Sequence, residues 1–134
     1  MDRNDRAIVG FVTVGHAMVH LYELSIPILM TIWLLEFSLT AALLGTAVAV
    51  GYGLFGIGAL PGGLLVDRYG ARRLVAACLV GMGLSFLVFR FAARIVGVAP
   101  ALSLLGISAS VYHPAGLTLI SNGVTVRRPR FAFH

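Results

Sequence analysis

Long apolar stretches run through this sequence, and short segments between them hold almost all of its charged residues. A helix needs about 20 predominantly apolar residues to cross a bilayer, and several of these stretches reach that length. Charged residues make up 11% of the 134 residues, whereas soluble domains carry roughly 25%. The sequence therefore predicts an all-α integral membrane protein, and this length leaves no room for a catalytic domain outside the membrane.

The spacing of the apolar stretches predicts four transmembrane helices that form a single membrane region, 1–134. At about 20 residues per crossing, this length accommodates four helices and little else. We expect Thr40 or Ser38 to cap the second helix, because a hydroxyl can accept from the free amides of its first turn. The predicted helices cover 7–35, 40–66, 72–93 and 98–121, and a basic cytoplasmic tail covers 122–134.

Small residues recur at four-residue spacing in the second predicted helix. In lipid, this spacing lets two helix backbones approach closely, because packing drives helix association there. The pattern predicts tight packing against another helix along Gly45, Ala49, Gly53, Gly58 and Gly62.

Arginine supplies all the basic side chains, and its distribution predicts the orientation. The arginines lie at the ends of apolar stretches and not on one polar face, which argues against a nucleic-acid partner. Cytoplasmic loops carry the excess of basic residues, so we expect both termini in the cytoplasm of a multi-pass plasma-membrane protein. Eight arginines then lie inside, namely Arg3, Arg6, Arg68, Arg72, Arg73, Arg127, Arg128 and Arg130. Only Arg90 and Arg94 lie outside.

A basic loop, Gly63-Leu64-Leu65-Val66-Asp67-Arg68-Tyr69-Gly70-Ala71-Arg72-Arg73, separates the second and third predicted helices. Gly70 permits a turn with positive φ, and Asp67 can accept a hydrogen bond from an arginine. On these residues alone, the loop is either a plain topological marker or a functional contact site.

This loop resembles the G-x-L-x-D-R-x-G-R-[KR] signature of the major facilitator superfamily, which lies between the second and third helices of those transporters. Ala71 replaces the first basic residue, and Arg72 and Arg73 can supply the charge. The segment Tyr112-His113-Pro114-Ala115-Gly116 is similar to the histidine–proline segment of fosmidomycin-resistance-like efflux permeases.

The resemblance implies that the chain corresponds to the amino-terminal third of a twelve-helix secondary transporter. Such a transporter moves a small molecule by alternating access, and the similarity to efflux permeases implies proton-coupled efflux. It implies that Gly63, Asp67, Arg68, Gly70, Arg72 and Arg73 form a cytoplasmic gating clasp. The implied partners are the lipid bilayer, a small-molecule substrate, protons, and either missing carboxyl-terminal helices or a second chain. We expect the chain to be a truncated part of such a transporter.

His16, His20 and Glu23 follow one another at i, i+4 and i+7, which places them on one side of a helix. Ionisable groups at membrane depth face a cavity or a partner because lipid solvates them poorly. At that depth Glu23 favours its neutral form and can exchange protons. We expect His113 at a depth similar to that of His20, and we hypothesise a substrate and proton pathway formed by His16, His20, Glu23, His113 and Tyr112, with Tyr22 and Ser110 nearby.

Other interpretations of these polar residues remain open. The cluster could simply hold helices together through hydrogen bonds. His16, His20 and Glu23 could bind one metal ion, and His20 with His113 could hold a b-type haem. A stand-alone dimer similar to small multidrug-resistance transporters would also have four helices and one intramembrane glutamate, although such proteins lack the loop signature. An inactive membrane fragment is a further alternative.

We expect no cofactor, no metal and no enzymatic activity. The sequence offers neither a nucleophile–base pair nor a pair of acidic residues suited to catalysis. Cys78 is the only cysteine, so no disulfide can form within the chain.

Overall fold

The protein is a bundle of long helices. The computed structural model describes residues 2–92 and 94–124, and the regular structure in these ranges is helical throughout. Four spans are long and apolar enough to cross a membrane, with α4 and α5 sharing the last one. The predicted all-α membrane fold is confirmed. The helices are α1 (Arg3–Glu36), α2 (Ala41–Tyr69), α3 (Ala71–Phe91), α4 (Ile95–Ser110) and α5 (Tyr112–Gly123).

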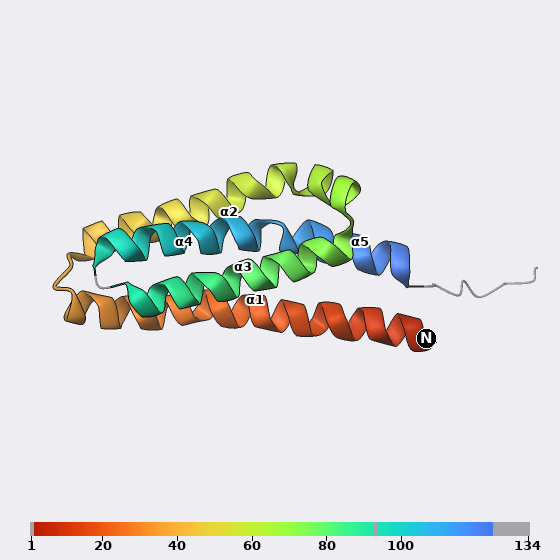
Figure 1. Cartoon of the computed structure of the whole chain (residues 1–134), viewed down its shortest axis with the longest axis horizontal. Helices are drawn as coiled ribbons and strands as arrows, with labels where there is room; N and C mark the ends of the chain where they lie inside the picture. Colours follow the sequence, from red (N-terminus) through yellow and green to blue (C-terminus); the bar gives the residue numbers. More distant parts are fainter. Residues whose placement is uncertain (1, 93, 125–134) are drawn as a thin grey trace, which may run out of the picture.

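The spans alternate in direction, so that each end of the bundle gathers one set of connections (Figure 1). The start of α1, the connection between α2 and α3, and the end of α5 lie at one end. The connections from α1 to α2 and from α3 to α4 lie at the other end. The expected cytoplasmic segments are therefore on one side of the bundle.

Side-chain and main-chain caps define where the helices begin. Asp2 caps α1 in a capping box, with its carboxylate 2.8 Å from the Asp5 amide and the Asp5 carboxylate 3.3 Å from the Asp2 amide. The Thr40 hydroxyl accepts from the Leu43 amide at 3.2 Å, so the predicted Thr40 cap is confirmed. These bonds satisfy amides that have no partner inside the helix.

The fourth span is interrupted at Val111, which the sequence did not lead us to predict. The Val111 amide bonds to the carbonyl oxygen of Ala109, and this tight turn separates α4 from α5. Pro114 provides the physical reason. A proline has no amide hydrogen for the carbonyl of the residue four positions earlier, here Ser110, and its ring crowds that carbonyl.

Each helix differs from its predicted range by a few residues at its ends. The predicted tail begins later than expected, because Asn122 and Gly123 belong to α5. Arg127, Arg128 and Arg130 of that tail lie outside the described residues.

The most extensive helix contact joins α2 to α4, where two glycines meet. A Cβ atom added at Gly106 would collide with the carbonyl oxygen of Gly51, and one added at Gly51 would lie 2.9 Å from the carbonyl oxygen of Leu102. Farther along α2, Gly58 packs on Ser110 and Gly62 on Pro114. The absence of side chains at these glycines allows the two backbones to approach.

The predicted close packing holds for only part of the glycine pattern. No heavy atom of another part of the described chain lies within 4 Å of a Cβ built at Gly45 or Gly53. Their expected tight contact is wrong for this bundle, because the side of α2 that meets α4 runs through Gly51, Gly58 and Gly62 instead.

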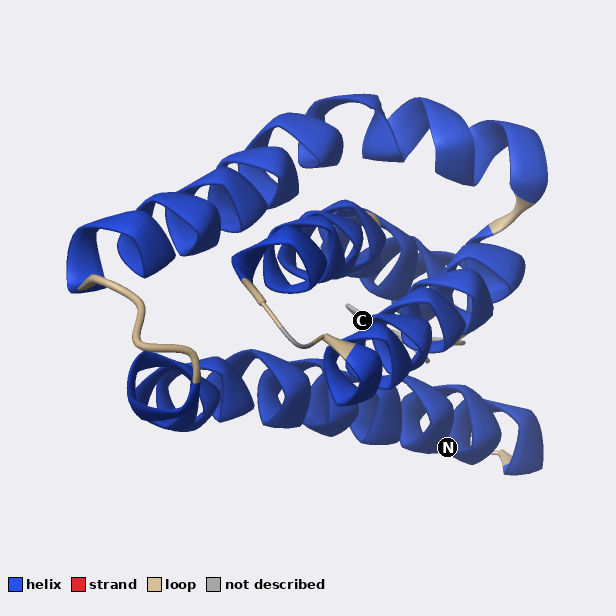
Figure 2. Ribbon diagram, turned by 60° about the vertical axis from the view of Figure 1, so that its left-hand side comes forward, coloured by secondary structure: helices blue, strands red, loops and turns tan. Residues whose placement is uncertain are grey.

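The helices α1 and α2 follow one another in the chain but have few contacts with each other. They run along opposite edges of the bundle (Figure 2). The helix α4 contributes residues to a cavity that α1 and α2 also line.

Large apolar side chains cover much of the outer surface. Leu24 of α1 and Leu60 of α2, for example, are 69% and 83% exposed. A soluble monomer rarely exposes wide apolar surface, whereas lipid tails solvate such side chains well. The surface is that of a multi-pass membrane protein.

Candidate functional site

Three polar side chains of α1 form a continuous line, as their spacing predicted. His20 Nδ1 lies 3.3 Å from Glu23 Oε2, and His20 Nε2 lies 2.9 Å from His16 Nε2. We call His16, His20 and Glu23 the polar line of α1. His20 is nearest the middle of α1, and His16 is nearest the end where α1 begins.

The polar line has a direction that follows from what each atom can donate. An ionised carboxylate only accepts hydrogen bonds, so a neutral His20 that faces Glu23 at 3.3 Å carries its proton on Nδ1. The Nε2 atom of that same ring then has a lone pair and accepts from Nε2–H of His16 at 2.9 Å. With both imidazoles neutral, the three groups form a row of close polar contacts along which a proton can move by successive transfers from His16 towards Glu23.

The α5 helix brings His113 and Tyr112 to the same region. The His113 ring centroid lies 5.7 Å from that of His16 and 6.3 Å from that of Phe55 on α2. The ring of Tyr112 lies 5.9 Å from that of His16. His113 is thus closest to His16, one helical turn from the expected neighbour His20, because α5 starts only after the break at Val111.

Tyr112 has a structural connection of its own. Its side chain is buried, and its hydroxyl donates to the main-chain carbonyl oxygen of Val12 at 2.5 Å. The ring touches the histidines while the hydroxyl is used to join α5 to α1.

Two residues that we expected nearby point elsewhere. The ring of Tyr22 packs against Phe86 of α3 at 4.9 Å between centroids. The buried Ser110 donates to the carbonyl oxygen of Ile107 at 2.7 Å and lies against Gly58 of α2. Neither is part of the line formed by the histidines and Glu23.

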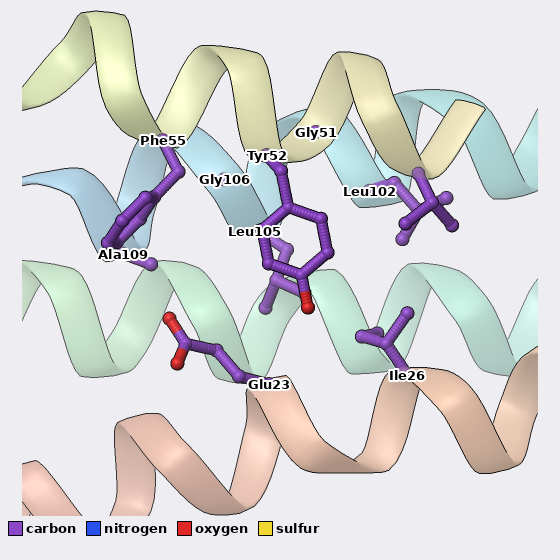
Figure 3. Close-up of a pocket in the computed structure, with 10 residues that line it drawn as sticks. Glu23, Ile26, Gly51, Tyr52, Phe55, Leu102, Leu105, Gly106 and Ala109 are labelled. Carbon is purple, nitrogen blue, oxygen red and sulfur yellow. The ribbon is translucent and has the colours of Figure 1, made fainter. Parts of the chain in front are cut away.

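A cavity adjoins the polar line at Glu23, between α1, α2 and α4 (Figure 3). It has an empty volume of about 320 Å³, part of which is open to the surroundings. In Figure 3 the Glu23 side chain points into the space between α1 and α2, and the hydroxyl end of Tyr52 points back towards α1. The lining residues are Glu23, Ile26, Val48, Gly51, Tyr52, Phe55, Leu102, Leu105, Gly106 and Ala109.

Tyr52 and Phe55 were missed in the sequence analysis. They lie three residues apart on α2 and therefore on the same side of that helix. The signal was an aromatic pair among small residues, Gly51-Tyr52-Gly53-Leu54-Phe55-Gly56. Its relation to Glu23 depends on how α2 packs on α4, which the spacing does not encode.

Glu23 is far from the fixed positive charges. The described arginines lie in the first or last turns of helices or beside them, at positions 3, 6, 68, 72, 73, 90 and 94. Among the ten residues that line the cavity, Glu23 is the only one with a charged side chain. His20 on α1 lies 3.3 Å from it, and Tyr52 on α2 lines the same cavity.

At the end where α1 begins, Gly70 alone connects α2 to α3. Its φ of +85° confirms the predicted positive-φ turn, and its amide bonds to the Val66 carbonyl oxygen at 2.8 Å. Asp67 has no ion pair within the described chain, and the guanidinium carbon of Arg68 lies 5.4 Å from the centre of the Tyr69 ring. Arg72 and Arg73 are exposed, as is Gly63 near the end of α2.

A second hollow lies between this turn and the end of α5. It has about 660 Å³ of empty volume, part of it open, and it is lined by Val66, Asp67, Gly70, Ala71, Thr118, Leu119, Asn122 and Gly123. Across residues 2–92 and 94–124, no three His, Cys, Asp or Glu side chains are arranged to hold a metal ion.

The fold and the intramembrane polar site define a multi-pass helical membrane protein. Comparison with models of protein families gives a match to the Major Facilitator Superfamily over residues 12–132. This match covers most of the chain, and the chain belongs to that superfamily of transporters. The comparisons with curated proteins and with solved structures found no match.

Proposed function

We propose that α1, α2, α4 and α5 form one wall of the pathway of a proton-coupled efflux transporter for a small molecule. The observation that carries this proposal is the position of the Glu23 side chain. It lies at membrane depth, borders a cavity and has no arginine beside it. A carboxylate without a fixed positive partner leaves its binding position open to a proton or to a cationic ligand, which coupling requires.

The polar line supports a route for that proton. Release of a proton from Glu23 uses the opposite tautomers, in which Nδ1 of His20 accepts from protonated Glu23 and Nε2 of His20 donates to His16. The proton would then leave towards the end of the bundle that we assign to the cytoplasm. The rings of His113 and Tyr112 flank this route. In this proposal the five residues are pathway residues, and the cavity beside Glu23 is where the substrate binds.

The exposure of the polar line supports further helices on this side. His20 is 47% exposed and Glu23 is 21% exposed within this bundle. Placing an ionisable group against lipid costs about 2.5–3.5 kcal/mol at a helix centre. We infer that protein or water, and not lipid, covers this side, and that more helices of the transporter or a second chain supply the opposite wall.

The basic loop would close the pathway at the cytoplasmic end. Asp67, Arg68 and Arg72 are exposed side chains beside the rigid turn at Gly70. Charged groups presented in this way can bind a segment on the opposite wall. We propose that the motif formed by these residues with Gly63, Gly70 and Arg73 is a clasp, in a plasma-membrane protein with both termini in the cytoplasm.

Transport in vesicles would test the function. The purified chain is reconstituted with a pH-sensitive dye inside, and three probes are offered across a pH gradient: phenyltrimethylammonium, methylphosphonate and betaine. In this assay a second copy of the chain must supply the opposite wall, and we then expect movement of one probe with counterflow of protons. Glu23→Gln removes the charge but keeps hydrogen-bonding capacity, so it should abolish proton counterflow.

Glu36→Gln is the matched control, because Glu36 is the exposed last residue of the same helix. It should preserve both movements. Coupled transport that persists in Glu23→Gln would contradict the proton-coupling role, and it would favour a cluster that only joins helices. No movement of any probe would contradict transport by this chain alone.

A further inference from the structure

We propose that the cavity beside Glu23 binds an organic cation with a single positive charge and an apolar body, preferably aromatic. This inference rests on the proposed function, since it names the class of substrate for the same site.

The charge of the cavity favours a cation. When His20 is neutral, ionised Glu23 leaves one uncompensated negative charge among the lining residues. Its Oε2 atom lies 3.3 Å from Nδ1 of His20, and no contact of Oε1 with another polar group is found in the described chain. A charge at low dielectric interacts strongly with an opposite charge nearby, so a cation entering the cavity gains most by approaching Oε1.

The walls favour an apolar and aromatic body. Tyr52 and Phe55 enter from α2, and Ile26, Leu102 and Leu105 contribute aliphatic side chains from α1 and α4. The ring face of a tyrosine or phenylalanine attracts a cation within about 6 Å of its centre. The Tyr52 side chain extends across the space towards Glu23, so one ligand can contact the carboxylate and an aromatic ring together.

The same residues disfavour other substrate classes. An anion would be repelled by Glu23 and would find no arginine. A sugar needs many hydrogen-bonding groups, whereas the helix backbones satisfy their own and the lining adds only Tyr52 and Glu23. A bare divalent ion needs about six oxygen ligands, and the cavity offers a single carboxylate.

Equilibrium binding to the intact chain tests this proposal separately from transport. The chain is placed in nanodiscs of zwitterionic lipid, with empty nanodiscs as the background. Radiolabelled phenyltrimethylammonium is the probe, and tert-butylbenzene, its uncharged analogue of the same shape, and benzenesulfonate are the competitors. We expect saturable binding of the cation that neither competitor displaces at equal concentration.

Variants locate the binding. Glu23→Gln should weaken binding of the cation about tenfold or more, as expected for loss of an interaction with a charged group. Glu23→Asp should keep the preference for the cation, and Glu36→Gln should leave the affinity unchanged. Tyr52→Leu should weaken binding by a factor of about 2–5 through loss of the ring face. Circular dichroism and size-exclusion profiles check that each variant is folded.

Three results would overturn the proposal: no saturable binding of the cation, equal displacement by benzenesulfonate, or unchanged affinity in Glu23→Gln. Selective binding without coupled movement in vesicles would refute transport by this chain alone and leave the cation site in place. Coupled movement of methylphosphonate or betaine, without cation binding, would support transport and refute this substrate class.

Discussion

The hydroxyl of Tyr112 donates a 2.5 Å hydrogen bond to the main-chain carbonyl oxygen of Val12, which lies 100 residues earlier in the chain. The bond joins the first and last described helices at the level of the histidines. Side-chain hydrogen bonds such as those of Ser25 and Thr31 are local, whereas this one connects two different spans.

Replacing Tyr112 with phenylalanine should destabilise the bundle by about 0.5–1.5 kcal/mol, since one interhelical hydrogen bond is lost. Unfolding of the purified chain in mixed micelles measures the effect. Tyr69→Phe is the control, because Tyr69 is exposed at the end of α2. Equal effects of the two substitutions would contradict a stabilising role for the bond to Val12.

Replacing Gly106 with alanine should destabilise the bundle by about 1–3 kcal/mol, because overpacking forces the two backbones apart. The atom in the way is the Gly51 carbonyl oxygen, which belongs to the main chain and cannot rotate aside. Gly45→Ala is the matched control in open space, and the higher helix propensity of alanine should make it neutral or stabilising. The same unfolding assay distinguishes the two.

Replacing Gly70 with alanine should cost about 1–3 kcal/mol through backbone strain alone. The φ of +85° and ψ of 139° disfavour any side chain, although no atom lies within 4 Å of the added Cβ. Gly63→Ala, in the same motif but in a helix with open space around it, should have little effect. A comparable loss in both variants would mean that strain at the turn is not the cause.

The polar line predicts a fixed tautomer for His20. Because Glu23 accepts from Nδ1, the neutral ring should carry its proton there, which imidazole ¹⁵N chemical shifts report. Glu23→Leu removes the acceptor and should move the proton of His20 to Nε2, whereas Glu36→Leu should not. An unchanged His20 spectrum in Glu23→Leu would contradict the hydrogen-bonded order of the line.

The proposed orientation predicts which residues are reached from each side of the membrane. In a Cys78→Ser background, Arg73→Cys should react with an impermeant maleimide only after the cells are opened. Glu36→Cys, at the opposite end of the bundle, should react in intact cells. The reverse pattern would contradict cytoplasmic termini.

Local periodicity was sufficient to predict the polar line, because residues at i, i+4 and i+7 share a side of any regular helix. The same reasoning could not identify Tyr52 as a neighbour of Glu23, since that relation depends on how two helices are rotated and packed. Gly45 and Gly106 illustrate the limit. The first has the spacing of a packing motif and meets nothing, whereas the second has no distinctive spacing and forms the closest backbone contact.

The break at Val111 depends on Pro114, whose effect on the helix could not be predicted from the sequence. Pro114 can kink a helix, end it or be tolerated within it, and the choice depends on whether neighbours satisfy the freed carbonyl. His113 lies beside His16, about one turn from the expected His20. The sequence therefore predicted that the histidines cluster, but not that His113 lies next to His16 instead of His20.

During synthesis, α1 enters the bilayer before α2 to α5, and at first lipid surrounds the side that carries His16, His20 and Glu23. Its most apolar window has a mean hydropathy of 1.6, the lowest of the four spans. Each leucine or isoleucine at a helix centre favours insertion by only about 0.3–0.6 kcal/mol, whereas an acidic residue there disfavours insertion by about 2.5–3.5 kcal/mol. The insertion of α1 therefore has the smallest margin of the four spans until the later helices arrive and cover this side.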